Sequence, residues 1–387
     1  MGWMVLLRQW TVPSLSSTTR SPWTTVPPWT TLLPPFGLVV LAAVWGRELP
    51  PALVAIVAVI LAGAVLAAVH HAEVVAHRVG EPFGSLVLAV AVTVIEVALI
   101  VTLILSGGPE TSSLARDTVF AAVMITVNGI LGLSLFVAAR REHVAVFNAE
   151  GTGAALAAVT TLATLSLVVP AFTTSEPGPQ FSPSQLAFAA VASLTVYGMF
   201  VVTQTVQHRD FFLPVAPPVV RADLTSAQEE HAAPPSDRVA AFSAGMLVVA
   251  LVAVVGLAKV ESPAIEAGVA ALGFPASFVG VIIAMLVLLP ETLAAVRAAR
   301  RGLVQTSLNL ALGSALASIG LTIPVIAVAS IWIEGPLILG LEPTQLVLLA
   351  LTVVVGVLTV LPGRAIRLQG GIHLVLLAAF LFLAINP

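Results

Sequence analysis

Long apolar runs recur along this chain from about residue 30 to its C-terminus, and they constrain its fold more than any other feature. Most of them are about 20 residues long, the length that a helix needs to cross ~30 Å of hydrocarbon. Strands of a membrane barrel would instead be alternating segments of about ten residues. The composition agrees, because only 9% of the residues are charged, against about 25% in a soluble domain. The sequence predicts an all-α polytopic membrane protein and excludes soluble enzymes and nucleic-acid-binding proteins.

Eleven apolar runs are long enough to be transmembrane helices, and a polar stretch divides them into two sets. They lie near 29–46, 51–72, 83–106, 118–139, 151–170, 184–206, 238–258, 266–293, 303–333, 344–361 and 371–386. The polar stretch, 207–237, holds five prolines and a charged middle, which is typical of a linker. We therefore expect a tail at 1–28, a first helix at 29–46, a five-helix unit at 51–206, a linker at 207–237 and a second five-helix unit at 238–387.

The basic residues test this count, because cytoplasmic loops of membrane proteins are enriched in Lys and Arg. With the N-terminus inside, only Arg47, Arg116 and Lys259 fall in outside segments. The other thirteen fall in inside segments: Arg8, Arg20, Arg78, Arg140, Arg141, Arg209, Arg221, Arg238, Arg297, Arg300, Arg301, Arg364 and Arg367. One missed span would abolish this separation. We therefore expect a cytoplasmic N-terminus, a cytoplasmic linker and a C-terminus on the outside.

Two acidic residues, Glu96 and Glu291, fall well inside the predicted helices. Each follows a phenylalanine by thirteen residues, Phe83 and Phe278 respectively. Their helices are five spans apart, an odd number, so they would cross the membrane in opposite directions, as in an inverted-topology repeat. A charged side chain at the bilayer centre costs roughly 2.5–3.5 kcal/mol, so such a pair indicates function. The alternative is two neutral, hydrogen-bonded carboxylic acids without a functional role.

Five polar residues near the glutamates are candidates for supporting ligands. Asn128 and Asn309 begin the similar segments NGILGLSL and NLALGSAL in the helices that follow the two glutamates. Ser314 and Ser318 share one face of the second of these helices, and Thr93 lies one turn before the first glutamate. Their hydroxyl and amide groups would supply neutral oxygens beside a carboxylate.

Pro290 stands directly before Glu291. Proline lacks an N–H and clashes with the preceding turn, so we expect a kink in this helix. Backbone carbonyls freed at membrane depth are tolerated where they line a cavity. A kinked helix with a carboxylate at the kink is typical of ion sites in secondary transporters.

Two carboxylates brought together can hold one divalent cation, or release it and take up protons. The chain has no cysteine, so oxygen or imidazole must hold any metal, and Glu96 and Glu291 are the candidate ligands. This competition predicts a cation/proton antiporter that needs no cofactor besides the transported cation and protons. A cation channel, a membrane-embedded enzyme and a non-transporting scaffold are the alternatives. The enzyme would need a nucleophile-elbow or zinc-protease motif, and the sequence contains neither.

His70, Glu73 and His77 follow one another at helical spacing near the cytoplasmic end of the second predicted helix. They could form a proton path or a weak metal site, since histidine titrates near neutral pH. The alternative is a polar helix end at the membrane–water interface.

Three segments carry a family resemblance: GEPFGSLVLAVAVTVIEVALI (80–100), PETLAAVRAARRGLVQTSLNLALGSALASIGLTIP (290–324) and QTVQHRDFFLP (204–214). They resemble the calcium/cation antiporter superfamily, most closely the cation/proton exchangers of the bacterial sodium/calcium–proton branch. Gly313-Ser314 matches the Gly-Ser of that family, whereas Val92-Thr93 and Val287-Leu288 stand where its plant and fungal exchangers carry Gly-Asn.

The resemblance implies one extra N-terminal helix followed by two inverted five-helix repeats, with Glu96 and Glu291 as shared ligands for cation and proton. It also implies a bacterial inner-membrane antiporter that exports calcium, with sodium and potassium as other candidates, in exchange for protons. Its expected partners are membrane lipid, inorganic cations and protons, and no nucleic acid. The sequence does not set the oligomeric state.

Overall fold

The computed structural model describes residues 27–47, 49–80, 83–106, 112–215, 235–332 and 335–387. Almost all of the predicted tail at 1–28, and most of the predicted linker at 207–237, lie outside the described residues. The helices are α1 (Pro28–Val44), α2 (Pro51–Val79), α3 (Phe83–Ser106), α4 (Leu114–Met124), α5 (Leu131–Glu142), α6 (Ala149–Ala163), α7 (Pro183–Val202), α9 (Asp237–Ala271), α10 (Phe278–Val287), α11 (Leu289–Arg300), α12 (Val304–Ala329), α13 (Pro343–Val360) and α14 (Arg367–Ile385). Short turns extend some of them: η2 (Ile125–Ile130), η3 (Thr164–Val168), η4 (Val169–Ala171), η5 (Thr203–Gln207) and η6 (Arg209–Phe212).

The predicted membrane class is confirmed. Among the described residues, eight helical segments are long and apolar enough to cross a membrane, and the bent pair α10–α11 makes a ninth. The two remaining predicted spans correspond to shorter apolar helices, α1 and the Val90–Thr102 part of α3. Each predicted span therefore overlaps a helical segment. The span predicted at 266–293 was placed too early, because its first residues belong to the end of α9 and the bent pair runs from Phe278 to Arg300. The count of eleven crossings stays a prediction.

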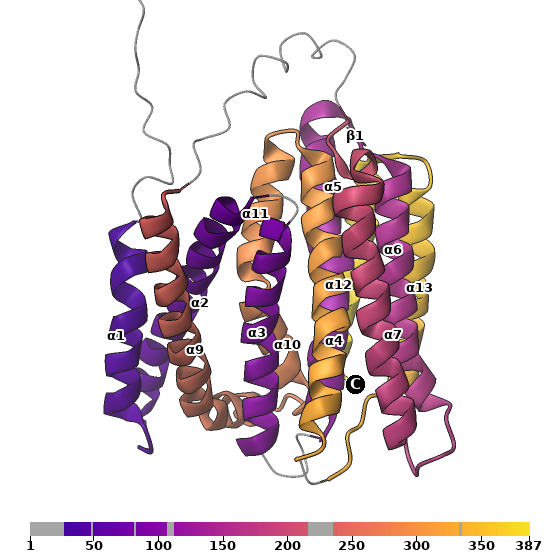
Figure 1. Cartoon of the computed structure of the whole chain (residues 1–387). Helices are drawn as coiled ribbons and strands as arrows, with labels where there is room; N and C mark the ends of the chain where they lie inside the picture. The colour runs from indigo at the N-terminus through magenta and orange to yellow at the C-terminus, as the bar shows by residue number, and fades with distance from the viewer. Residues whose placement is uncertain (1–26, 48, 81–82, 107–111, 216–234, 333–334) are drawn as a thin grey trace, which may run out of the picture.

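Two large apolar cores divide the described part of the molecule, beside a third small one. One joins α1, α2 and α9 with one face of α3 and of α10, and the larger one joins α4 to α7 with α11 to α14 and the other face of α10. Figure 1 shows α1, α2 and α9 on one side, the α4–α7 and α12–α13 group on the other, and α3, α10 and α11 between them. Glu96 is therefore carried by a helix of the smaller core, and Glu291 by a helix of the larger one.

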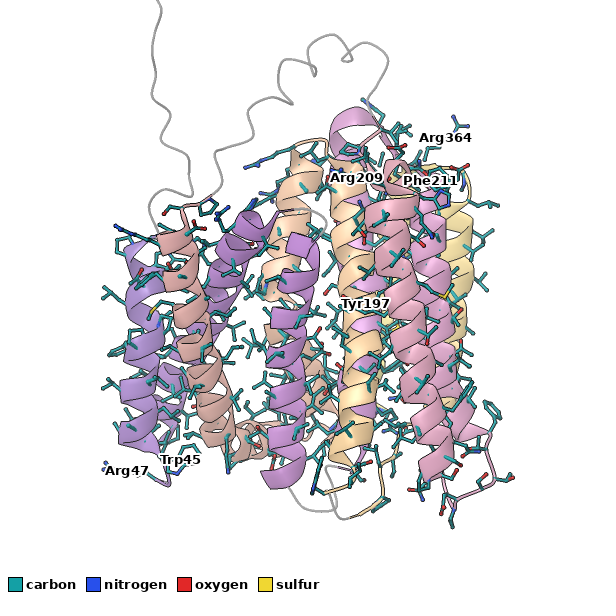
Figure 2. All side chains as sticks on the ribbon, in the orientation of Figure 1. Trp45, Arg47, Tyr197, Arg209, Phe211 and Arg364 are labelled. Carbon is teal, nitrogen blue, oxygen red and sulfur yellow. The ribbon has the colours of Figure 1, made fainter. Side chains whose placement is uncertain are left out.

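Interactions between loops define the two ends of the helical bundle. At the linker end, β1 (Val144–Val146) pairs antiparallel with β2 (Arg364–Ile366), and Arg78 forms an ion pair with Asp237. At the other end, Arg116 contacts Glu342 at 3.1 Å and the Lys259 ammonium lies 5.4 Å from the Trp45 ring centroid. Figure 2 shows Arg209 and Arg364 at one end and Arg47 at the other. The predicted outside residues thus lie opposite the linker, and which end faces the cytoplasm stays a prediction.

Several spans contain turns that are not α-helical, among them the π-helical turns η3 and η5, and two further irregular spans bear on the predicted site residues. The π-helical turn η2 separates α4 from α5, and such turns occur frequently at functional sites. The second irregular span bends by 53° where α10 ends and α11 begins, with Leu288 at φ −84° and ψ 0°. The predicted kink beside Pro290 is confirmed, and it is a complete break between two helices.

Candidate functional site

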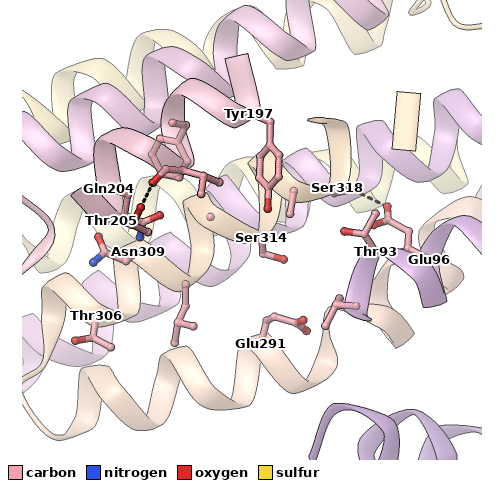
Figure 3. Close-up of a pocket in the computed structure, with 16 residues that line it drawn as sticks. Thr93, Glu96, Tyr197, Gln204, Thr205, Glu291, Thr306, Asn309, Ser314 and Ser318 are labelled. Atoms are coloured by element: carbon pink, nitrogen blue, oxygen red, sulfur yellow. Dashed lines mark hydrogen bonds between the residues drawn. The ribbon is translucent and has the colours of Figure 1, made fainter. Parts of the chain in front are cut away.

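Both predicted glutamates line one cavity of about 200 Å³, and α3, α7, η5, α11 and α12 form its walls. Figure 3 shows Glu96 and Glu291 from two different helices pointing into the same space, with Ser314 and Tyr197 facing them across it. The two glutamates, which are 195 residues apart in the sequence, are therefore brought together at the boundary between the two cores.

Glu96 is held in place by a hydroxyl from the other half of the chain. Its side chain is 3% exposed, and Ser318 of α12 donates a hydrogen bond of 2.6 Å to its Oε1 atom. Thr93, one helical turn earlier on α3, is also buried and lines the cavity. Thr93 and Ser318 thus lie where the sequence predicts supporting oxygens.

Glu291 has a different environment. It lies in the first turn of α11, directly after the break at Leu288. The N-terminal end of a helix carries partial positive charge and stabilises a nearby anion by about 0.3–1 kcal/mol. Its Oε2 atom is buried, and no group of the described residues gives it a hydrogen bond. Glu96 and Glu73 both lie within electrostatic reach of it.

This geometry limits what the cavity can do. Two carboxylates that share a small buried space repel one another, so protons or a cation must accompany them. A buried carboxylate oxygen without a partner is costly, because it loses water and gains nothing in exchange. In the described parts of the chain, no group of three or more His, Cys, Asp or Glu side chains could hold a metal ion. The polar groups that line the cavity are thus two carboxylates and neutral oxygen- and nitrogen-bearing side chains.

The cavity extends from the glutamates toward the linker end. Its lining follows α12 from Ser318 back to Thr306, a length of about 18 Å at 1.5 Å per residue. Asn309 lies along this path, but its Oδ1 accepts from Gln305 (2.9 Å) and its Nδ2 donates to the Phe212 carbonyl (2.7 Å). Ser314 lies nearer to the glutamates and lines the cavity. Asn309 therefore fixes the rim of the cavity rather than facing the glutamates.

Asn128, the remaining predicted supporting residue, does not line the cavity. It lies in η2 and is fully buried. Its amide nitrogen donates to Thr352 at 2.8 Å, and its amide oxygen lies 3.0 Å from Nδ1 of His373. In this conformation its side chain is bound by α13 and α14, and it does not line the cavity that the glutamates share.

The predicted proton-path residues lie on α2, in the smaller core. Glu73 is half-buried and lies within electrostatic reach of Arg297 on α11. His70 has a buried Nε2 atom with no hydrogen-bond partner among the described residues, and His77 lies at the exposed helix end. Glu73 is thus the member of this group that can influence the cavity electrostatically, and the role of all three stays a prediction.

The sequence profile of the sodium/calcium exchanger protein family matches residues 49–206 and 242–386, and each matched segment contains one of the two glutamates. The chain belongs to the sodium/calcium exchanger family. Exchangers of this family are transporters, so the predicted exchange transport is confirmed at this level and the enzyme alternative is set aside. The predicted calcium/cation antiporter superfamily is likewise confirmed, and with it a multi-pass membrane protein of a bacterial antiporter family.

Two curated relatives of the exchanger are similar over nearly their whole length. The sodium-potassium/proton antiporter ChaA of Escherichia coli is 33% identical over 90% of this chain and 94% of its own. A protein of Sinorhizobium fredii, y4hA, whose name describes an ionic transporter, is 45% identical over 94% of this chain and 97% of its own.

Two solved structures share the exchanger fold at low sequence identity. That of YfkE has a TM-score of 0.67 at 16% identity and covers 93% of this chain and 99% of its own. That of the H⁺/Ca²⁺ exchanger CAX has a TM-score of 0.63 at 15% identity and covers 91% and 86%. At this identity the likeness shows a common fold.

Several cavity residues of the exchanger were not predicted from the sequence. Tyr197, Gln204 and Thr205 line it from α7 and η5, and Thr306 lines it from α12. Tyr197 is the single tyrosine of the chain, and its ring packs where α7 passes close to Gly320 of α12. A hydroxyl or amide at the end of an apolar helix is ordinary at a membrane interface, so only tertiary packing identifies these residues as part of the site.

Two buried acids outside the cavity were also missed. Glu261 is 1% exposed on α9, which continues to Ala271, well beyond the predicted end at 258. Asp117 is buried against Arg116 at 2.8 Å, because α4 begins at Leu114 rather than at the predicted 118. In both cases the helix extends past its apolar stretch, so the hydropathy pattern placed the acid in a loop.

Proposed function

We propose that this exchanger moves a cation out of the cytoplasm in exchange for protons, with Glu96 and Glu291 as the shared binding groups. One observation carries the proposal. Two glutamates at corresponding positions of the two halves line one buried cavity, and one of them keeps a buried oxygen without a partner among the described residues.

Competition at one site explains the coupling. When Glu96 and Glu291 are both ionised, a divalent cation neutralises them, and when the cation leaves, protons do so instead. Either state removes the repulsion between two buried anions, while the empty, doubly charged state is disfavoured. A site that holds cation or protons but not both exchanges one for the other when it opens alternately to the two sides.

Calcium is the first candidate for the transported cation. It prefers hard oxygen ligands, including carboxylates, at flexible geometry, and the cavity offers two carboxylates with the hydroxyls of Thr93, Ser314 and Ser318. Sodium and potassium use the same type of ligand. They are the second candidates because the E. coli relative is named a sodium-potassium/proton antiporter.

The direction of transport follows from the expected orientation. The cavity extends toward the linker end, where the sequence places thirteen of the sixteen basic residues. The positive-inside rule makes that end cytoplasmic. In this conformation the site would then receive its cation from the cytoplasm, and the proton would enter from the opposite side of the membrane.

Proton-gradient collapse in everted vesicles tests this function. Calcium, sodium and potassium are added separately to vesicles that contain the wild-type protein, Glu96→Gln, Glu291→Gln or the control Glu266→Gln, which removes an exposed carboxylate of α9. We expect the effective cation to collapse the gradient with wild type and Glu266→Gln only. The concentration that it requires should rise as the pH falls, by up to about tenfold per pH unit for each proton displaced.

Two outcomes would contradict the proposal. If both glutamine variants respond as wild type does, the shared site is wrong. If wild type is silent to all three ions, cation/proton exchange of these ions is wrong.

A further inference from the structure

The two glutamates differ in a way that the repeat does not predict. Glu96 and Glu291 each lie thirteen residues after the first residue of their helical segment, Phe83 or Phe278. Ser318, the partner of Glu96, lies fourteen residues after Val304, where α12 begins. The corresponding residue of the first half lies fourteen residues after Leu114, where α4 begins, and it is Asn128. The similar segments pair Asn128 with Asn309, whereas counting from the helix starts pairs it with Ser318. By this second count, the Asn128 amide should face Glu291 as Ser318 faces Glu96.

Asn128 is instead engaged by two polar residues of the last two helices, Thr352 of α13 and His373 of α14. We call these two residues, together with Thr359 of α13, which contacts His373, the His373 cluster. Asn128 Nδ2 donates to Thr352 Oγ1 at 2.8 Å. Its Oδ1 can only accept, so His373 Nδ1 carries the proton and donates to it at 3.0 Å. Thr359 Oγ1 lies 3.2 Å from the other ring nitrogen, Nε2, and so holds the far side of the imidazole.

The backbone around this cluster leaves the imidazole little freedom. A methyl group added to Gly132 of α5 would lie 2.6 Å from His373 Cβ. One added to Gly370 of α14 would lie 2.6 Å from the Phe136 backbone nitrogen. The two helices therefore pass as closely as two glycines allow, and His373, which is 0% exposed, is fixed directly over Gly132.

The turn that carries Asn128 is suited to change. A π-helical turn holds one extra residue, and moving that residue along the helix rotates the side chains it passes by about 100°. Helices α13 and α14 pack on η2, and so does α11, the helix that carries Glu291. A local shift in η2 would rotate the Asn128 side chain away from the His373 cluster, among packed helices that include α11.

We propose that His373 is a positioning residue that keeps Asn128 away from Glu291 while the cavity extends to the linker end. In the opposite conformation the freed amide donates to Glu291, as Ser318 does to Glu96 here. This inference rests on the proposed exchange for its purpose, but the contacts that carry it lie outside the cavity. Losing His373 should therefore shift the balance between the two conformations without removing a cation ligand.

A labelling experiment on the full-length protein measures that balance without transport. The chain has no cysteine, so Thr306→Cys introduces a single thiol at the linker end of the cavity. A hydrophilic maleimide labels it in purified protein when the cavity is open to that end. The labelling rate is compared in protein with His373, with His373→Leu, which removes both ring nitrogens, and with His373→Asn, whose Nδ2 takes the place of Nδ1.

We expect His373→Leu to slow the labelling about tenfold, the size of effect that one or two lost buried hydrogen bonds produce. His373→Asn should restore most of the rate because it still donates to Asn128. In an Asn128→Leu background, His373→Leu should have no further effect, because residues that act through one another are not additive.

Three results would overturn the proposal: an unchanged rate in His373→Leu, no rescue by His373→Asn, or additive effects in the double variant. If His373→Leu fails to fold, Thr352→Val replaces it, since it removes the other partner of Asn128 and should slow labelling in the same way. If His373→Leu changes the labelling rate but the wild-type protein shows no cation exchange in vesicles, only the proposed function is refuted. If the wild-type protein exchanges cations normally but His373→Leu leaves the labelling rate unchanged, only the role of His373 is refuted.

Discussion

Two helix pairs of this exchanger correspond to one another and differ in packing. In one pair, α12 of the second half and α7 of the first half line the cavity, and no described atom beyond the backbone around Gly313 lies within 4 Å of a methyl group added there. In the other pair, α5 of the first half and α14 of the second half close directly on Gly132 and Gly370. Each pair joins a central helix of one half to the last helix of the other half. We call the α12–α7 contact the hollow seam, because it borders the cavity although Tyr197 closes on Gly320 elsewhere along it, and we call the α5–α14 contact the tight seam.

Filling the hollow seam should have the largest effect. Gly313→Phe would place a ring in the cavity beside Ser314. We expect it to reduce the rate of exchange by about a hundredfold, because moving a reacting group by only about 1 Å can have an effect of that size. The folded protein should remain as stable as wild type, because the ring enters empty space. Cation-dependent gradient collapse and thermal unfolding in detergent measure the two quantities.

Gly198→Leu is the matched control for that change. It adds bulk to the same helix, α7, but on its outer face. Gly198 is exposed, and no described atom beyond the backbone around it lies within 4 Å of an added methyl group. Exchange should be unchanged. Equal loss in the two variants would mean that the cavity is not the transport path.

Overfilling the tight seam should affect stability. Gly370→Ala would place a methyl group 2.6 Å from a backbone nitrogen and 2.8 Å from the Gly132 carbonyl oxygen. Backbone atoms cannot rotate away, so we expect a loss of about 2–3 kcal/mol in the free energy of unfolding. The neighbouring Gly371→Ala meets no described atom within 4 Å and should change it by less than about 0.5 kcal/mol. Denaturant unfolding in detergent compares them, and equal stabilities would mean that α5 and α14 are not tightly packed.

Removing the hydrogen bond at Glu96 should have the smallest effect of the three. Ser318→Ala leaves a buried carboxylate oxygen without its 2.6 Å partner, and we expect cation affinity to change by about tenfold. Ser318→Thr keeps the hydroxyl and should stay near wild type. Cation titrations of exchange measure the affinity, and an Ala variant that matches wild type would show that Ser318 packs beside the site without acting on it.

The parts of this structure that hydropathy controls could be predicted from the sequence. Every predicted span overlaps a helix, because only a helix satisfies its backbone polar groups inside a bilayer. Glu96 and Glu291 were found because a carboxylate within a long apolar run has few explanations. The kink at Pro290 follows from the missing N–H of proline.

The parts that depend on side-chain direction could not be predicted. Asn128 looks equivalent to Asn309 in sequence, yet η2 turns its amide toward His373, and no local pattern signals a π-helical turn. Tyr197 enters the site only because α7 crosses α12 at Gly320. The hydropathy pattern places Glu261 in a loop, because its own segment is not apolar. Neighbouring helices nevertheless bury its side chain, and burial of this kind cannot be read from local hydropathy.

The pairing of β1 with β2 bears on how the protein is made. These strands join residues 144–146 to residues 364–366, and Phe147 donates a further backbone hydrogen bond of 3.0 Å to Gly363. Contacts this distant along a chain form late, because the intervening segment must first be synthesised and ordered. During synthesis, α5 therefore enters the membrane long before α14, the helix that covers its glycine face, exists. The first half completes its packing only when the last helix arrives, so the two halves mature together rather than one after the other.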